Sequence, residues 1–158
     1  MSLNYDLSQL GPCGVPNYGY DTNTPCIILK LNKIHKWIPD CYDSMTMPDN
    51  MPSRLQEVIE ITSLNSSEKR VWVSCDGLNP ADEEHMGEIQ FYPDPSFKAS
   101  FFPFSGQDDY HTPLIAVQFL NPSLGILTTV QCKAWAKNLK HETTSAEFLL
   151  MIGFKDYG

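Results

Sequence analysis

The chain of 158 residues is poor in basic side chains and has no long apolar run. Its 11 lysines and arginines stand against 19 aspartates and glutamates, which gives a formal net charge of −8 at pH 7. Nucleic-acid binding depends on clustered basic side chains, so this balance argues against a nucleic-acid partner. The longest apolar stretch, residues 113–120, is interrupted by Gln118 and is far shorter than the ~20 residues of a membrane span. We therefore expect none of this sequence to cross a membrane.

Motifs of the common enzyme classes are also missing. The sequence has no G-x-S-x-G elbow, H-E-x-x-H pair, P-loop or G-x-G-x-x-G turn. Cys41 lies six residues from His35 and could form a Cys–His nucleophile, but an unpaired surface cysteine is the simpler interpretation. The run Asp82-Glu83-Glu84-His85 could bind a metal, although a solvated acidic turn is favoured. The histidines lie in polar or loop-like sequence: His35, His85, His111 and His141. We predict no enzyme, no metal site and no cofactor.

None of the five cysteines belongs to a C-x-x-C pair, which argues against zinc ribbons and thioredoxin-type chemistry. Cys13 and Cys26 bracket a loop rich in glycine, proline, asparagine and tyrosine, whereas Cys75 and Cys132 each end an alternating apolar run. This arrangement predicts an extracellular disulfide framework, with five reduced, buried thiols as the alternative. Cys41 would then be left over. The triplet beginning at Asn65 is an acceptor for N-glycosylation, which fits the same compartment.

Twelve prolines and nine glycines fall between short apolar runs. Short apolar runs separated by such turn residues are typical of an all-β domain. The strand candidates are residues 26–31, 71–75, 88–92, 99–102, 114–120, 126–135 and 146–154. A short helix over residues 54–59, with Ser53 as its cap and Gln56 in a capping box, competes with a strand over residues 58–62. These spacings predict an antiparallel β-sandwich with one short helix and long loops. If the two cysteine-bearing runs lay in opposite sheets, a Cys75–Cys132 bridge would pin the sheets together.

A single domain is the simplest organisation. We expect residues 1–3 to be an expression scar, because Met1-Ser2-Leu3 runs directly into polar sequence without the apolar core of a signal peptide. Residues 4–158 then form one domain, in which residues 4–25 are an irregular disulfide loop and residues 26–158 are the sandwich.

Five aromatic residues cluster within fourteen positions: Phe97, Phe101, Phe102, Phe104 and Tyr110. Adjacent residues of an extended segment point to opposite faces, so the rings of Phe101 and Phe102 cannot both face inward. Pro103 also argues against a central strand here. Some of these rings are therefore predicted to lie in a surface patch of the kind that marks interfaces. Local packing within an irregular loop is the alternative.

Several motifs, in order, resemble the extracellular domain of the β subunits of sodium/potassium and proton/potassium pumps. The matching stretches cover nearly the whole chain and are Leu10-Gly11…Cys13-Gly14, Tyr18-Gly19-Tyr20, Pro25-Cys26-Ile27-Ile28-Leu29-Lys30-Leu31-Asn32, Val73-Ser74-Cys75-Asp76-Gly77, Pro113-Leu114-Ile115-Ala116-Val117-Gln118-Phe119 and Gln131-Cys132-Lys133-Ala134-Trp135. At Trp37 and in the region rich in Met and Pro the sequence departs from the vertebrate pattern. In these features the chain looks more like an invertebrate member of the family.

The resemblance implies an immunoglobulin-like sandwich in which Cys13 pairs with Cys26 and Cys75 with Cys132. It implies a glycosylated, single-pass type II protein of the plasma membrane, anchored by a span outside this sequence. Such a subunit is not catalytic: it escorts and stabilises the catalytic α subunit of a P-type pump and modulates cation transport. The family's aromatic stretch against α reads here as Phe101-Phe102-Pro103-Phe104-Ser105-Gly106, with Tyr110 nearby. Pump-independent cell–cell adhesion, through homophilic or junctional partners, is the alternative function.

Overall fold

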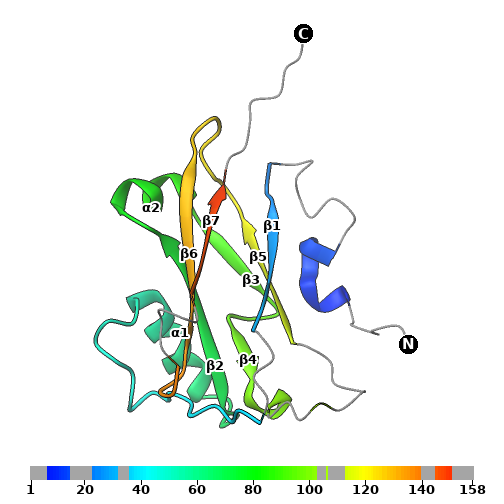
Figure 1. The fold of residues 1–158 in the computed structure, drawn as a ribbon, viewed down its shortest axis with the longest axis vertical. Coiled ribbons are helices and arrows are strands. Elements are labelled where there is room, and N and C mark those ends of the chain that lie inside the picture. Colours follow the sequence, from blue (N-terminus) through cyan, green and yellow to red (C-terminus); the bar gives the residue numbers. More distant parts are fainter. Residues whose placement is uncertain are drawn as a thin grey trace.

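The computed structural model describes residues 7–14, 23–31, 36–102, 106, 113–139 and 145–150. Within them are seven strands: β1 (Cys26–Lys30), β2 (Arg70–Gly77), β3 (Ile89–Tyr92), β4 (Ser96–Lys98), β5 (Leu114–Phe119), β6 (Thr128–Trp135) and β7 (Ser145–Leu150). The strands form a three-stranded sheet of order β1-β5-β3 and a four-stranded sheet of order β4-β2-β6-β7, and every pairing is antiparallel (Figure 1). The predicted all-β sandwich is confirmed.

The main core lies between the two sheets. Alternate residues of a strand point to the same face, so β2 contributes Val71 and Val73 to this core, and β5 contributes Ile115, Val117 and Phe119. These five side chains are at most 4% exposed. Each one stabilises the fold by roughly 1.5–3 kcal/mol through removal of its apolar surface from water.

The outer face of the four-stranded sheet is covered by the helix α1 (Ser53–Ser63). Leu55 and Ile59, four residues apart and therefore on one face of the helix, pack on the paired indoles of Trp72 and Trp135. The helix is longer than the predicted residues 54–59, and the competing strand over residues 58–62 is wrong. Pro52 rather than Ser53 occupies the N-cap position, so the predicted side-chain cap does not form.

The outer face of the three-stranded sheet is covered by a 3-10 segment, η1 (Leu7–Gly14), which precedes β1 in the sequence and lies beside this sheet (Figure 1). Leu10 and Cys13 pack here against Ala116 of β5. Residues 113–119 are therefore buried on both faces of the sheet, apart from the half-buried Leu114. Double-sided burial accounts for the nearly continuous apolar character of this run.

A second helix, α2 (Pro80–Met86), follows β2 directly and was not predicted. Asn79 caps it, because its side-chain oxygen accepts a hydrogen bond from the Asp82 backbone N–H at 2.9 Å. Gly77 permits this sharp return: a β-carbon at that position would overlap the backbone of Glu83. Met86 anchors the helix in the main core.

The strand predicted over residues 99–102 is wrong. Residues Ala99–Phe101 form a 3-10 turn, η3, and the preceding three residues form β4 instead. The pairing of β4 with β2 stops one residue earlier, at Lys98 opposite Arg70. The Phe102 N–H bonds back to the Ala99 carbonyl at 3.0 Å, which closes the turn.

Candidate functional site

The disulfide Cys13–Cys26 joins η1 to the first residue of β1. It closes a separation of 13 residues, and both cysteines are buried against the outer face of the three-stranded sheet. This is the first of the two pairs that the family resemblance implied. Its effect is to hold the N-terminal segment as a covering layer on β5.

The second disulfide, Cys75–Cys132, joins β2 to β6. Cys75 and Cys132 are register partners on neighbouring strands of one sheet, with their α-carbons 4.0 Å apart. The possibility that this bridge links opposite sheets is therefore wrong. Cohesion between the two sheets in this region comes from the apolar core and not from a covalent bond.

The aromatic segment is anchored by Phe102, which is only 9% exposed. Its ring packs edge-on against Trp37, with ring centroids 5.2 Å apart and an interplanar angle of 81°. Phe102 is therefore one of the rings that face inward, and the prediction of a surface patch rests on the other rings. Gly106 is exposed with φ near 81°. The ring of Phe101, and the whole of Phe104 and Tyr110, lie outside what the structure describes.

Asn65 follows the end of α1 and is exposed, as a glycosylation acceptor must be. Its side-chain nitrogen lies 3.5 Å from the Ile61 carbonyl oxygen. The exposed Ile61 and Leu64 flank it, so a glycan on Asn65 would stand beside apolar surface.

Cys41 is the free cysteine among the described residues and is half-buried. Burial raises the pKa of its thiol, and the Asp40 carboxylate raises it further against the opposing effects of Lys69 and Lys137. A thiol with a raised pKa is a poor nucleophile at neutral pH. His35, the partner considered for it, lies outside the described residues.

The acidic run in α2 has structural partners. The Asp82 carboxylate accepts a hydrogen bond from the Thr129 N–H at 3.1 Å. Glu83 accepts one from the Gly77 N–H and pairs with Arg54 at 2.8 Å. His85 faces Ser123, with 3.1 Å between Nδ1 and Oγ. Asp82 and Glu83 thus hold α2 against β2, β6 and α1, instead of forming the solvated turn that the sequence favoured. In the described part of the chain, no cluster of three metal-ligating side chains occurs.

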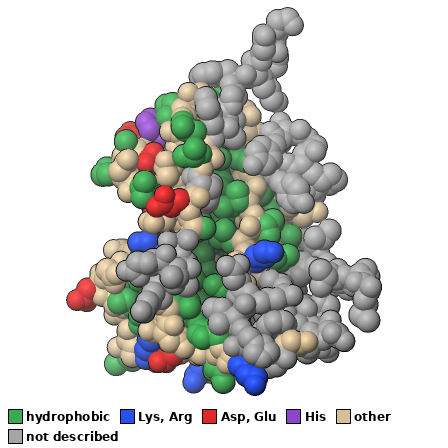
Figure 2. Space-filling view, viewed as in Figure 1, with side chains coloured by type: hydrophobic (Ala, Val, Ile, Leu, Met, Phe, Trp, Pro, Cys, Tyr) green, Lys and Arg blue, Asp and Glu red, His purple; other side chains and the backbone are tan. Residues whose placement is uncertain are grey.

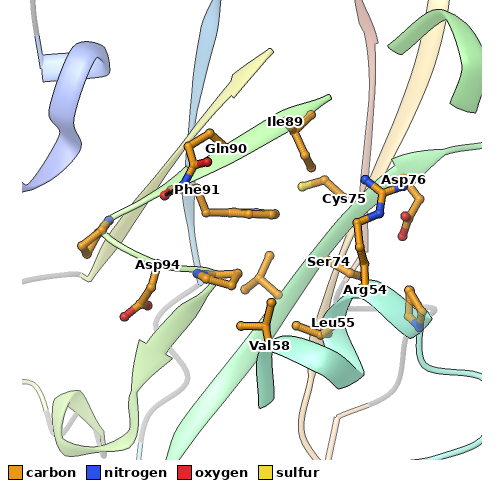
Figure 3. A pocket seen from close by; sticks show the side chains of 14 residues that line it. Arg54, Leu55, Val58, Ser74, Cys75, Asp76, Ile89, Gln90, Phe91 and Asp94 are labelled. Carbon is orange, nitrogen blue, oxygen red and sulfur yellow. Dashed lines mark hydrogen bonds between the residues drawn. The ribbon is translucent and has the colours of Figure 1, made fainter. Parts of the chain in front are cut away.

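A cavity of about 300 Å³ opens between the edges of the two sheets. Its walls come from α1, the middle of β2, β3 and the turn between β3 and β4 (Figure 3). The apolar wall residues are Pro52, Leu55, Val58, Val73, Ile89, Phe91, Pro93 and Pro95. Sequence reasoning missed this cavity because four separate segments meet to form it, and no local motif marks it.

Asp76 also lines this cavity, and unlike the other charged side chains there it has no ion pair among the described residues. Arg54 already pairs with Glu83, and Asp94 already pairs with Arg70 at 2.9 Å. Burial raises the pKa of Asp76, and the nearby Glu83 carboxylate raises it further. Arg54 and Lys133 act in the opposite direction but do not cancel the burial effect. Among the described residues, no hydrogen bond or ion pair satisfies the Asp76 carboxylate.

Figure 2 shows how charge is distributed over one face of the molecule. Most of the lysine and arginine side chains drawn there lie toward the lower end, whereas histidine and several acidic side chains lie at the upper end around α2, with other acidic side chains lower down. No continuous basic surface spans the described part of this face. Within the described ranges, no helix has the length and apolarity that crossing a membrane requires.

Comparison with known proteins adds to this picture. A family profile described as "Sodium / potassium ATPase beta chain" matches residues 2–154. The sequence is 44% identical over 140 residues to sodium/potassium-transporting ATPase subunit beta-1 of Drosophila melanogaster, covering 88% of this chain. It is 42% identical over 141 residues to subunit beta-2 of the same organism, covering 87% of this chain. Subunit beta-2 of Mus musculus is 26% identical over 162 residues, covering 98% of this chain.

These matches cover only part of each relative. The aligned regions make up 44% of both Drosophila proteins and 47% of the mouse protein. The chain therefore spans less than half the length of the curated relatives that it matches.

Proposed function

Because the chain belongs to the family of sodium/potassium ATPase beta chains, we propose that it is the extracellular part of a non-catalytic accessory subunit of a P-type cation pump. The family match over residues 2–154 carries this proposal. The subunit binds the catalytic α subunit, stabilises and escorts it to the plasma membrane, and modulates cation transport. The two disulfides support an extracellular location, because disulfides persist in oxidising compartments.

The aromatic segment is the proposed contact with the α subunit. In this proposal Phe101, Phe104 and Tyr110 supply apolar contact area, and Gly106 lets the partner approach the backbone closely. Phe102 has a different role, because its ring packs on Trp37 and anchors the segment to the core. In this way Phe102 positions the other rings. Each ring that becomes fully buried against α would contribute roughly 1.5–3 kcal/mol.

The proposal is tested by co-expressing the full-length subunit with a sodium/potassium pump α subunit from an insect. We expect the two proteins to co-purify, and we expect ATPase activity at the cell surface to rise above that of α alone. A correctly folded, disulfide-bonded subunit that neither binds α nor raises activity would contradict the proposal. In that case adhesion would become the leading hypothesis, and sedimentation at high concentration would test for homophilic association.

The contact assignment has its own test. The double variant Phe104→Ala/Tyr110→Ala should reduce co-purification with α, while the domain keeps its unfolding midpoint. Leu127→Ala is the matched control, because Leu127 is 56% exposed and lies in the β5–β6 connection, at the end of the sandwich opposite η3 (Figure 1). Equal co-purification by both variants would remove the aromatic segment from the proposed interface.

A further inference from the structure

The edge of β2 that faces the cavity carries unpaired backbone groups. The Val73 N–H bonds to the Pro95 carbonyl at 2.9 Å, on the side of β2 away from β6. Successive residues of a strand direct their N–H and C=O groups alternately to the two sides. Cys75, two residues further on, therefore directs both groups to the same side as Val73. Beyond Trp72, β4 no longer pairs with β2, so no described residue bonds to these groups of Cys75.

The opposite wall of the cavity is also an open sheet edge. The Glu88 carbonyl accepts a hydrogen bond from the Leu120 N–H at 2.9 Å, toward β5. By the same alternation Ile89 and Phe91 direct their backbone groups away from β5, into the cavity. Figure 3 shows the side chains of Ile89 and Phe91 pointing from β3 toward that of Cys75 on β2. The described contact to these groups is a long one, 3.5 Å from the Gln90 side-chain nitrogen to the Phe91 carbonyl oxygen.

The two ends of the open stretch of β2 are closed. Pro95 occupies one end through its bond to Val73, and the Glu83 carboxylate occupies the other through its bond to Gly77. Between them, the four residue steps from Val73 to Gly77 span ~13 Å at about 3.3 Å per residue. A free edge of this length is a template for one short extended segment and not for a long strand.

We propose that this cavity binds a short extended segment of a partner protein, whose backbone pairs with Cys75 and whose basic side chain lies beside Asp76. The mode is strand addition, in which backbone hydrogen bonds hold the segment and alternate side chains provide selectivity. The inference goes beyond the proposed pump function and does not depend on it.

The lining of the cavity specifies the chemistry of the segment. A residue opposite Cys75 points its side chain to the same face as Cys75, toward Val73 and Phe91, and should be apolar. Its neighbour opposite Asp76 points to the other face, where the Asp76 carboxylate has no ion pair among the described residues, and should be Lys or Arg. The occupant is thus an extended segment in which an apolar residue is followed or preceded by a basic one.

The test is a titration of the isotope-labelled domain, with its disulfides intact, with the peptide acetyl-Val-Lys-Val-Thr-Val-amide, followed by amide NMR shifts. We expect the largest shifts at Cys75, Ile89 and Phe91. A peptide with an N-methyl group on its central valine cannot donate to the Cys75 carbonyl and should bind at least tenfold more weakly. A peptide with glutamate in place of lysine should also lose affinity.

Two protein variants separate a specific site from general attraction to an acidic protein. Asp76→Asn should weaken binding of the lysine peptide three- to fivefold, as expected for one partly exposed charge pair. Asp49→Asn removes the same charge from an exposed position outside the cavity and should leave the affinity unchanged. The proposal is overturned by the absence of shifts at these amides at millimolar peptide, by equal binding of the N-methyl peptide, or by equal effects of the two variants.

A strand edge of a second copy of the chain could also pair with the free edge of β2. In that case the Cys75, Ile89 and Phe91 amides would shift with protein concentration in the absence of peptide. That result would overturn the assignment to a separate partner protein.

Discussion

Phe102 and Trp37 form a contact between two segments that are 65 positions apart in sequence (102 − 37 = 65). Phe102 belongs to the main core, and the half-buried Trp37 and Cys41 pack against that core. The segment around Trp37 is tied to the end of β6 by backbone and side-chain bonds between Asp40, Lys137 and Asn138. Phe102 therefore fastens the chain after η3 to one end of the sandwich, and its replacement should be felt in the stability of the whole domain.

We expect Phe102→Ala to lower the free energy of unfolding by about 3 kcal/mol, the low end of the range for a buried phenylalanine replaced by alanine. Urea denaturation of the purified domain measures this loss. The control is Leu64→Ala, at a residue 83% exposed, which should change stability by less than about 0.5 kcal/mol. Similar midpoints for the two variants would show that the Phe102 ring contributes little packing.

Asp76 should make the domain less stable as the pH rises. Its pKa in the folded state is raised above the ordinary value of 3.8, so the folded protein binds the proton more tightly than the unfolded chain. The resulting stabilisation is fully present below pH 3.8 and is lost as the pH rises through the raised pKa. Asp76→Asn should therefore be more stable than the wild type at pH 7, and this advantage should shrink toward pH 3.

Urea midpoints of the wild type and Asp76→Asn across this pH range provide the measurement. Asp43 provides a comparison in which stability depends on pH in the opposite direction, because hydrogen bonds from Met45 and Thr46 lower the pKa of its carboxyl. Its contribution is present above pH 3.8 and is lost as the pH falls through the lowered pKa. If the advantage of Asp76→Asn at pH 7 persisted unchanged at pH 3, the effect would not come from the Asp76 charge.

At the scale of elements, the strands with the clearest apolar pattern were the predictable ones. β1, β2, β5 and β6 coincide with runs that the sequence marks by β-branched residues and by flanking turn residues. Their identity is set by local composition and by the need to bury one or both faces. The same patterns predicted the sandwich, because no helical period of comparable length competes with them.

The elements that sequence reasoning missed depend only in part on local signals. The helix α2 has a local start signal, Asn79 as its cap followed by Pro80. The bond from the Thr129 N–H to Asp82, by contrast, joins residues 47 positions apart and could not be read from the sequence. The apolar composition of residues 99–102 suggested a strand. The preceding residues, Ser96–Lys98, form β4 instead, and their pairing with β2 ends at Arg70, the first residue of β2. At residues 99–102 tertiary pairing thus overrides local propensity.

The candidate sites also divide into features that the local sequence predicts and features that only the tertiary structure determines. The cysteine pairing could be expected from spacing and family resemblance, because four cysteines stand in distinctive sequence surroundings. That Cys75 and Cys132 share a sheet could not, since the order β2-β6 is a property of the topology. The cavity was beyond sequence reasoning for a similar reason: it exists where β4 stops short and leaves part of β2 uncovered.

The open edge of β2 makes a prediction about hydrogen exchange. The Cys75 N–H faces the cavity, whereas the N–H groups of Ser74 and Asp76 face β6. We expect the Cys75 amide to exchange at least tenfold faster than either neighbour, although all three lie in the middle of one strand. Amide exchange followed by NMR at neutral pH measures the three rates. Equal protection of Cys75 would mean that its N–H is bonded and that the edge is closed.

The whole molecule is a stack of four layers: η1, the three-stranded sheet, the four-stranded sheet and α1. The two disulfides act at different places in this stack. Cys13–Cys26 fastens the outermost N-terminal layer to β1, and Cys75–Cys132 reinforces one sheet. The fold should therefore respond differently to the loss of each bridge.

We expect Cys75→Ala/Cys132→Ala to lower the free energy of unfolding by about 4 kcal/mol, because this bridge closes a separation of 57 residues. Cys13→Ala/Cys26→Ala, with a separation of 13 residues, should cost about 3 kcal/mol. Urea denaturation of each double variant, with Cys41 left intact, gives the comparison. A larger loss for the Cys13–Cys26 variant would show that η1 does more for stability than the constraint on the unfolded chain accounts for.

The placement of Cys75–Cys132 within one sheet also has a mechanical consequence. The N-terminal layer is bonded to β1 in one sheet, and β7 belongs to the other. A tensile load applied between these two ends would pass through Cys13–Cys26 to β1 and then cross to the other sheet, a plane that neither disulfide spans. The sheets would slide or peel apart before Cys75–Cys132 carried the load, so resistance to stretching depends on the core between the sheets and not on the redox state of that bridge.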